Sequence, residues 1–407
     1  MIAACGQVPA TTMGQAAEVW PVIARLANEA AEGGTDLFVL PEAAYPAYYL
    51  ESRERYLKAD IERSAKVLER LGALAAKHAF WLVAGFVEEQ GERLYNSAAV
   101  FDRSGKLVGV ARKNFLWDCD HRWFTPGDEL SVFETELGRM GVLICADARV
   151  PEIPATLVHD RAQFIVDPTA WVNTSLVRRT YRNAQPDFLI RARALEFGVP
   201  LVCAGKAGRE GTVFEYVGQS QVVDAGGQVL AKAPLGGEHV VGAEITPADP
   251  KPLGLDAAWR RRLLSEQPPY RPEKPTARPC KVRLRVDVDA IAAELEAGGV
   301  RVGRLAVRDL ASFAPIRCLA LDGAQVVVAR GRIADDTVVR TRAVENRVFV
   351  VVASDGAQFA IDPDGAIVWR RVDWPDAIDL DIAQADVKQF NPGTDLWAQR
   401  RVQCYRL

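Results

Sequence analysis

The sequence predicts a layered α/β or α+β sandwich followed by a smaller, partial α/β domain. Helical patterns alternate with short apolar runs and hairpins through the first 272 residues, which is typical of helices packed on sheets. Residues 246–280 are then rich in proline, the composition of a tail and linker. The residues after this segment repeat part of the first domain. We therefore expect a first domain over 1–272, a linker over 273–280 and a second domain over 281–407.

The first domain contains strand-sized apolar runs separated by helical patterns. One helical stretch runs through Leu26 to Gly33, a second follows Asp60, which we expect to cap it, and a third lies near 186–197. Residues 102–105 have the chemistry of a hairpin turn. Strands are expected at 2–8, 35–40, 81–87, 95–101, 106–110, 141–145, 163–167, 199–204, 213–223 and 228–232. Strands in this number, interrupted by helices, indicate sheets covered by helical layers.

Segments of the second domain resemble segments of the first in the same order. The difference in residue number between matching segments decreases along the chain, which indicates that loops were lost from the second copy. The similar segments are 141–166 with 303–328, 191–204 with 340–353, and 222–227 with 360–365. Val307 stands at the place that corresponds to Cys145. We therefore expect residues 281–407 to be a partial duplicate that catalyses nothing and supports the first domain.

The composition is that of an ordinary globular protein. Lys and Arg total 50 and Asp and Glu total 53, which gives a formal net charge of −3. So small a net charge favours neither nucleic acid nor a membrane surface as a partner. No apolar run approaches the ~20 residues of a membrane helix, and the N-terminus lacks the pattern of a signal peptide. We expect a cytoplasmic protein.

The cysteines indicate reduced thiols. There are seven, scattered along the chain, which is no disulfide framework. Cys119 and His121 are close in sequence, but no further pair completes a metal site. We therefore expect no metal site.

Three polar side chains each follow an apolar, strand-like segment. Glu42 follows LFVLP, Lys113 follows LVGVAR and Cys145 follows GVLI. Taken singly, each fits a plainer role: the cysteine as a small buried hydrophobe, the glutamate as a cap and the lysine as a surface cation. A sandwich that brings these strand ends together would instead place a carboxylate, an ammonium and a thiol in one pocket.

That set of groups has a mechanism. A free thiol has a pKa of about 8.5, so at neutral pH it attacks a carbonyl well only if a neighbouring base takes its proton. Glu42 would be this base, while Lys113 and the backbone N–H of Ala146 would stabilise the oxyanion. The carboxyl group would then protonate the leaving amine and activate water against the thioester.

Longer motifs around these residues resemble the nitrilase superfamily over roughly residues 1–272. The segments that carry the resemblance are LFVLPE (37–42), LYNSAAVFDRSGKLVGVARKNFLW (94–117), FTPGD (124–128), GRMGVLICADARVPE (138–152) and RARALE (191–196). The resemblance implies a four-layer αββα sandwich, followed here by a partial nitrilase-like domain. It implies Glu42 as general base, Lys113 as oxyanion stabiliser and Cys145 as nucleophile, with no cofactor. It also implies a homo-oligomer, a dimer or a higher assembly.

One position departs from the family pattern. Relatives often carry a second glutamate after the lysine, and the nearest match in this sequence is Asp120, which is one methylene shorter. We expect its carboxylate to face the same pocket and to contact Lys113 or Glu42 if it replaces that glutamate.

The residues after the nucleophile resemble the amidase and N-carbamoylase branches rather than true nitrilases, which carry Trp-Glu there. Arg149 is then either a clamp for a substrate carboxylate or an internal partner of Glu152 or Asp147. Aromatic residues near the motifs are candidates for an apolar substrate pocket, though each also fits the core: Tyr48, Trp117 and Trp171.

We therefore expect hydrolysis of a small-molecule amide or N-carbamoyl compound through a cysteine thioester. Acyl transfer to an amine and nitrile hydrolysis remain alternatives, because both use the same nucleophile. A glutaminase is disfavoured because no Gly-rich nucleotide loop accompanies the domain, and a non-catalytic scaffold fits only residues 281–407.

Overall fold

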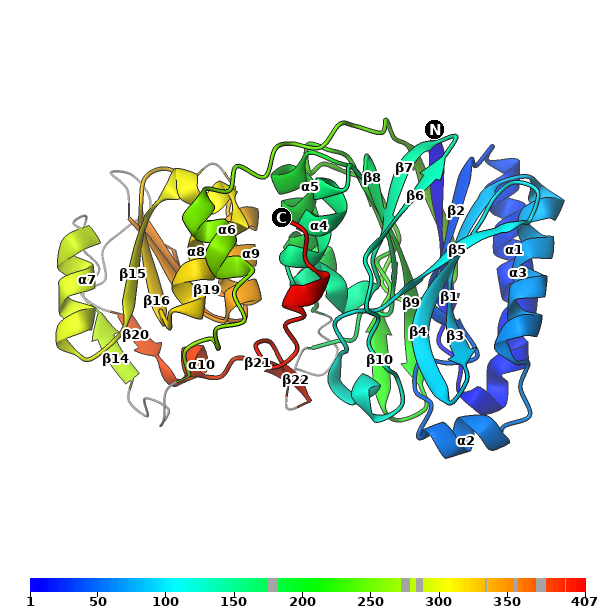
Figure 1. Cartoon of the computed structure of the whole chain (residues 1–407), viewed down its shortest axis with the longest axis horizontal. Helices are drawn as coiled ribbons and strands as arrows, with labels where there is room; N and C mark the ends of the chain where they lie inside the picture. Colours follow the sequence, from blue (N-terminus) through cyan, green and yellow to red (C-terminus); the bar gives the residue numbers. More distant parts are fainter. Residues whose placement is uncertain are drawn as a thin grey trace. The chain divides into compact units, whose positions relative to one another are not determined.

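The protein divides into two compact units. The computed structural model describes residues 1–174, 182–271, 279–282, 288–333, 335–353, 358–370, 378–391 and 393–407. The first unit comprises Met1–Pro252 with Cys404–Arg406, and the second comprises Leu253–Gln403 with Leu407 (Figure 1). The first unit ends earlier than the boundary expected after residue 272, because α6 (Ala257–Leu263) belongs to the second unit. Most of the expected linker, 273–278, lies outside the described residues.

The first unit begins with a mixed sheet. Its strands, in spatial order, are β5 (Leu107–Arg112), β4 (Arg93–Phe101), β3 (Trp81–Gln90), β2 (Leu37–Tyr45), β1 (Ile2–Pro9) and β13 (His239–Glu244). Strands β1, β2 and β3 are parallel, and their neighbours run antiparallel. Parallel strands buried on both faces read as continuous apolar runs, which is why LFVL was recognisable in the sequence.

A second sheet faces the first. Its strands, in spatial order, are β6 (Ser131–Thr135), β7 (Gly138–Val142), β8 (Phe164–Thr169), β9 (Leu201–Glu210), β11 (Gln221–Val223) and β12 (Val229–Lys232). The sheets join where Val8 of β1 pairs with Lys206 of β9. Strand β10 (Phe214–Val217) pairs with the end of β9. Thus the single strand expected over 213–223 is two strands, and β6 and β13 were not expected from the sequence.

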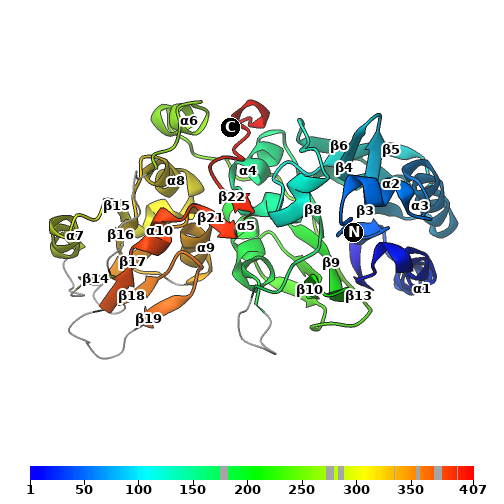
Figure 2. The same cartoon turned by 90° about the horizontal axis from the view of Figure 1, so that it is seen from below.

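Helices cover the outer face of each sheet, which makes the first unit an αββα sandwich (Figures 1 and 2). Helices α1 (Val19–Glu32) and α3 (Ser64–His78) pack on the first sheet, where Leu26 and Leu71 join Phe38 and Phe101 in one apolar cluster. Helices α4 (Glu152–His159) and α5 (Ile190–Phe197) lie on the second sheet.

The expected cap of α3 is wrong. The helix begins at Ser64 after Arg63, which makes no side-chain capping hydrogen bond, and Asp60 lies before it. A short helix, α2 (Arg53–Lys58), with Ser52 as its capping residue, precedes this segment instead. A local capping pattern is a weak signal when a second helix ends a few residues earlier.

The second unit is built around one five-stranded sheet. Its order is β15 (Val302–Ala306), β16 (Val326–Arg330), β17 (Phe349–Ala353), β18 (Gln358–Ile361) and β19 (Ile367–Arg370). The first three strands are parallel and the last two antiparallel. Helices α8 (Phe313–Leu321) and α9 (Thr337–Asn346) lie on one side of this sheet (Figure 1).

The other side of that sheet is covered within the same unit. Helix α7 (Val288–Ala297) packs its buried Ile291 and Leu295 against Val326 and Val328 of β16. Residues of the segment around β20 (Ile378–Asp381) belong to the same apolar cluster. The second unit therefore supplies its own cover for this apolar face of its sheet.

Two structural features have a bearing on function. Within the described ranges, none of the helices has both the length and the apolar character needed to cross a membrane. Across the same residues, no group of three or more His, Cys, Asp and Glu side chains is arranged to hold a metal ion.

Candidate active site

Three different elements deliver the expected trio. Glu42 lies in β2, Lys113 directly follows β5, and Cys145 is the first residue of a short 3₁₀ turn that follows β7. The side chains of Glu42 and Lys113 are fully buried, and Cys145 is 7% exposed. The fold thus brings together side chains that are widely separated in the sequence.

The Lys113 ammonium lies between two carboxylates. Its Nζ donates to Glu42 Oε1 at 2.6 Å and to Asp120 Oδ2 at 2.7 Å. Asn96 Nδ2 donates to the same Glu42 oxygen at 2.7 Å, and the Trp117 N–H donates to Asp120 Oδ2 at 3.0 Å. Asp120 is therefore buried and contacts Lys113.

Cys145 stands on a strained turn. Its φ is +52°, a region that a non-glycine residue adopts at a cost, and such turns present a nucleophile above a strand end. Its N–H donates to Asp167 Oδ1 at 2.5 Å, and its carbonyl oxygen accepts from Gln185 Nε2 at 2.7 Å. Among the described residues, the Ala146 N–H has no backbone acceptor.

Asp147 ties the lysine and cysteine segments together. Its carboxylate accepts the N–H groups of Asn114 at 3.1 Å and Phe115 at 2.7 Å, directly after Lys113. It also accepts the Ile144 N–H at 3.1 Å, directly before the nucleophile. One buried carboxylate therefore holds both segments, which sets the spacing of the ammonium and the thiol.

The electrostatics favour a charged lysine and a protonated thiol. Burial raises the pKa of Cys145 well above its usual range; Glu42 raises it further and Lys113 opposes the shift. Burial lowers the pKa of Lys113, but the carboxylates of Asp120 and Glu42 outweigh this and hold it well above its ordinary value. Attack by Cys145 thus requires a base that takes its proton.

The expected aromatic residues divide into two groups. The ring of Tyr48 lies 5.5 Å from Lys113 Nζ, and the Trp117 ring lies 4.6 Å from the Arg149 guanidinium carbon, so both adjoin the site. Trp171 is 1% exposed and accepts the Val217 N–H at its carbonyl oxygen, as a core residue does.

Arg149 is buried and lies in the same 3₁₀ turn as Cys145. Its Nε donates to Gln185 Oε1 at 3.0 Å, and a terminal nitrogen donates to Asn183 Oδ1 at 3.2 Å. Because Gln185 in turn donates to the Cys145 carbonyl oxygen, the guanidinium supports the turn that carries the thiol.

Sequence reasoning missed several polar residues of the site. Asn96 lies inside β4, in the LYNS motif, and Gln185 follows a segment with no recognisable periodicity. Lys206 lies in the apolar strand β9, and it is buried although lysine is rarely so. A lysine inside an apolar strand is the signal that could have identified it.

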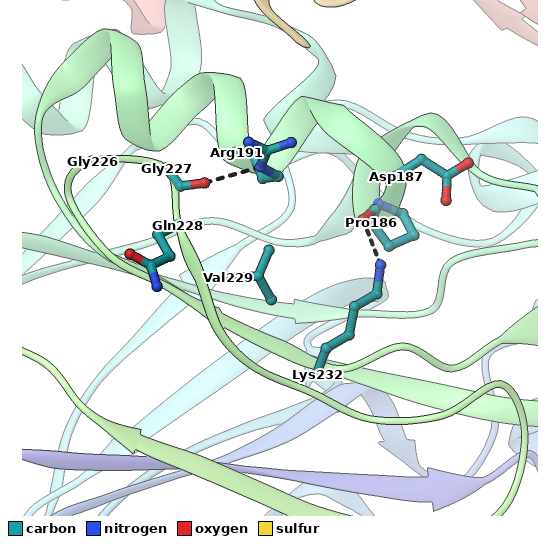
Figure 3. Close-up of a pocket in the computed structure, with 8 residues that line it drawn as sticks. All are labelled: Pro186, Asp187, Arg191, Gly226, Gly227, Gln228, Val229 and Lys232. Carbon is teal, nitrogen blue, oxygen red and sulfur yellow. Dashed lines mark hydrogen bonds between the residues drawn. The ribbon is translucent and has the colours of Figure 1, made fainter. Parts of the chain in front are cut away.

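An open surface pocket of about 490 Å³ lies elsewhere in the first unit (Figure 3). Its lining comes from the start of α5 and the β11–β12 turn, and includes Arg191, Gly227 and Lys232. Arg191 and Lys232 donate to main-chain oxygens there. None of the expected catalytic residues lines this pocket.

The fold is an αββα sandwich in which Glu42, Lys113 and Cys145 are buried, and sequence comparison identifies the family. The carbon–nitrogen hydrolase family model matches residues 2–253, so the chain belongs to the carbon–nitrogen hydrolase family of the nitrilase superfamily. The omega-amidase of Xenopus tropicalis is 32% identical over 232 residues, which are 54% of this chain and 80% of that protein. The deaminated glutathione amidase of Bos taurus is 31% identical, and the aligned region covers 52% of this chain and 67% of that protein.

Solved structures agree on the fold. A carbon–nitrogen hydrolase from Helicobacter pylori superposes with a TM-score of 0.53 at 26% identity, over 60% of this chain and 89% of that one. An amidase from Nesterenkonia sp. AN1 superposes with a TM-score of 0.53 at 23% identity, over 60% of this chain and 92% of that one. The nitrilase-like sandwich therefore accounts for the first unit.

Proposed function

We propose that this protein hydrolyses the carbon–nitrogen bond of a small amide or N-carbamoyl compound through a thioester on Cys145. The observation that carries the proposal is the buried Lys113 ammonium held by Glu42 at 2.6 Å and Asp120 at 2.7 Å, beside a thiol on a strained turn. An ion pair so deeply buried is costly to maintain unless its groups act on a ligand.

The two carboxylate oxygens of Glu42 have different surroundings, which supports different roles for them. Oε1 accepts from Lys113 and Asn96, whereas Oε2 accepts no hydrogen bond from the described side chains. Oε2 would take the proton of the Cys145 thiol as the sulfur attacks the substrate carbonyl carbon. The carbonyl oxygen then carries a negative charge, which Lys113 and the Ala146 N–H would stabilise.

The remaining steps return the enzyme to its starting state. The protonated Glu42 gives its proton to the leaving nitrogen, the C–N bond breaks, and ammonia or an amine departs. Water then attacks the thioester while Glu42 takes a proton from it, and the acid is released with the thiol restored. Asp120 would hold Lys113 in place throughout, and we propose that it does the work of the glutamate found in relatives.

Related proteins support the choice of chemistry. Similar proteins include omega-amidases. A structure of a glutamate-to-glutamine mutant of the Nesterenkonia amidase carries the product of a Michael addition of acrylamide at its active site cysteine. Acrylamide is therefore a suitable probe for Cys145 in the Glu42→Gln variant of this chain.

We propose a supporting role for Arg149 rather than that of a carboxylate clamp. Its guanidinium already donates to Gln185 and Asn183 and lies over Trp117. To bind a substrate carboxylate, it would have to give up bonds that hold the nucleophile turn.

We further propose that the second unit is a degenerate, partial copy of the second sheet of the sandwich. Hydrogen bonds recur at the offsets of the sequence repeat. The pairs are Ile144 N–Asp147 with Ala306 N–Asp309, Arg139 N–Gln163 with Arg301 N–Gln325, Arg193–Ala148 O with Arg342–Leu310 O, and Arg191–Gly227 O with Arg340–Gly365 O. The strand directions recur as well, with the same register shift at 222/223 and at 360/361.

The copy would be silent because its turn has changed. The 3₁₀ turn of the second unit begins at Val307, as that of the first begins at Cys145. Val307 is not among the described residues with positive φ, so the strain has been lost together with the thiol. A β-branched residue adopts that conformation poorly.

A substrate screen tests the proposed function. Primary amides, N-carbamoyl amino acids and nitriles would be incubated with the wild type and with Cys145→Ala, and ammonia release would be followed. We expect turnover of an amide or carbamoyl compound by the wild type only. Turnover by Cys145→Ala at the wild-type rate would contradict the proposal, and formation of an N-acyl product with added amine in preference to acid would indicate an acyltransferase.

A further inference from the structure

A second buried ammonium lies in the sandwich and takes no part in the mechanism above. Lys206 is in β9, where that strand meets β1, and its side chain is 1% exposed. Its Nζ makes no hydrogen bond to any residue that the structure describes. The nearest carboxylate oxygen, Glu210 Oε2, is 4.0 Å away, beyond hydrogen-bond distance.

The carboxylate of Glu210 accepts hydrogen bonds from donors other than Lys206. Its Oε1 accepts the Tyr49 N–H at 2.6 Å, and its Oε2 accepts the Tyr216 hydroxyl at 2.6 Å. The carboxylate therefore balances part of the charge of Lys206 without using its N–H donors. Those donors stay available in a place from which bulk water is excluded.

A chain of contacts leads from this ammonium to the catalytic groups and begins at Glu210, its ion-pair partner, which accepts the Tyr216 hydroxyl. The Tyr216 ring packs edge-on against Tyr48 at 6.2 Å, and Tyr48 lies 5.5 Å from Lys113 Nζ. Burial lowers the pKa of Lys206, while the carboxylates of Glu210 and Glu42 oppose that shift.

A buried ammonium without an acceptor is costly, and bound ligands commonly satisfy such groups. We propose that Lys206 is a specificity-determining residue that donates to an oxygen acceptor on the substrate, separate from the scissile amide. This inference rests on the proposed function, since it concerns the substrate of the same site. It predicts that the substrate is a bifunctional amide with a carboxylate or a carbonyl as its second polar group.

Binding to an inactive variant tests the inference without turnover. Cys145→Ala and Cys145→Ala/Lys206→Met would be titrated calorimetrically with butyramide, glutaramide, glutaramate and N-carbamoyl-β-alanine. Butyramide has no second acceptor, glutaramide a neutral one, glutaramate an anionic one on the acyl part, and N-carbamoyl-β-alanine an anionic one on the amine part. We expect at least one of the last three to bind about 10- to 100-fold more tightly than butyramide, and Lys206→Met to abolish that advantage.

Controls separate a specificity role from a structural one. Lys206→Met should change butyramide affinity less than about two-fold, and Lys232→Met, which removes a lysine outside the site, should change none of the affinities. If Lys206→Met fails to fold, Lys206→Gln, a shorter and neutral donor, should also lose most of the advantage. Equal affinity for all four compounds, or equal weakening of all four by the substitution, would overturn the inference. Turnover of butyramide by the wild type but not by Cys145→Ala would still uphold the proposed function.

Discussion

Glu42 has two oxygens in different surroundings, and this asymmetry makes its role testable. Replacement by glutamine keeps the shape of the side chain and one acceptor for Lys113 but removes the base. We expect Glu42→Gln to lower kcat by about 10²- to 10⁴-fold, the usual contribution of a general base. Glu88→Gln is a matched control, because Glu88 of β3 forms a partly exposed ion pair with Arg112 of β5 across the intervening strand β4. Steady-state kinetics of both variants would check this, and near wild-type turnover by Glu42→Gln would exclude it as the base.

Asp120 should be visible in the pH dependence of activity. The pKa of Lys113 is held well above its ordinary value in part by Asp120, so the wild type should stay active until alkaline pH. Removing a neighbouring negative charge disfavours the ammonium and lowers its pKa. In Asp120→Asn the alkaline fall of kcat/KM should therefore move to lower pH, with activity at pH 8 reduced about 10-fold. An unchanged alkaline limb and full activity would remove Asp120 from the site.

Residues at strand ends were the part of the site that the sequence predicted. Glu42, Lys113 and Cys145 each follow a recognisable apolar run, and all three are buried, with Lys113 donating to Glu42 at 2.6 Å. The supporting residues were not predictable in this way. Gln185 donates to the carbonyl oxygen of Cys145, a contact between residues that are far apart in the sequence. Lys206 was not predicted because its ammonium lacks an acceptor among the described residues, a property of the folded structure alone.

At the scale of elements, the contact between β2 and β3 sets the position of the general base. A Cβ atom on Gly85 of β3 would lie 2.3 Å from Pro41 O and 2.6 Å from Glu42 Cα, so the strands must separate to admit it. We expect Gly85→Ala to lower the melting temperature by about 3–10 °C, because overpacking typically costs about 1–3 kcal/mol. Activity should fall with it, because Glu42 is displaced.

Gly14 provides the matched control for that substitution. Its nearest neighbour would be Thr12 Oγ1 at 4.0 Å, and its φ is not positive, so Gly14→Ala should leave melting temperature and activity unchanged. Thermal unfolding and kinetics of the two alanine variants would be compared side by side. A silent Gly85→Ala would show that β3 does not constrain Glu42.

Element prediction succeeded where one local pattern decides the structure. The apolar runs of β1, β2 and β8 were recognisable in the sequence, because strands buried on both faces do not alternate apolar and polar residues. The antiparallel strands β6 and β13 are partly exposed and lack that signal. The packing of α7 on the sheet of the second unit was not predicted, because α7 lies outside the segments that repeat the first domain.

At the scale of the whole molecule, the C-terminal residues belong to the catalytic unit. The Arg406 guanidinium donates to Asp160 at 2.7 Å and to the Leu130 carbonyl oxygen at 2.9 Å, and its N–H donates to Thr156. We expect Arg406→Ala to lower the melting temperature of the first unit by about 2–4 °C. Arg308→Ala, with a side chain 89% exposed, is the control and should have no effect. Equal melting temperatures for the two variants would contradict a stabilising role for the contacts of Arg406.

A further prediction follows from the proposal that the second unit catalyses nothing. If the second unit is a silent copy, introducing a thiol there should not restore chemistry, because the carboxylate and the ammonium come from the first sheet. Cys145→Ala/Val307→Cys should therefore release no ammonia in the substrate screen. Recovered turnover would show that the second unit keeps a working site. The cytoplasmic location and the homo-oligomeric state expected from the sequence stay predictions, the second to be tested by sedimentation of the full chain.

The central claim is that Cys145 carries the acyl group, and mass spectrometry of the quenched enzyme tests it most directly. The wild type and Cys145→Ala would each be mixed with the best amide of the screen, quenched in acid, and examined as intact protein and as peptides. The account predicts a mass increase of one acyl group on the wild-type peptide that contains Cys145, labile to hydroxylamine as a thioester is, and none on Cys145→Ala. An acyl group on another residue, or turnover by Cys145→Ala at the wild-type rate, would contradict it.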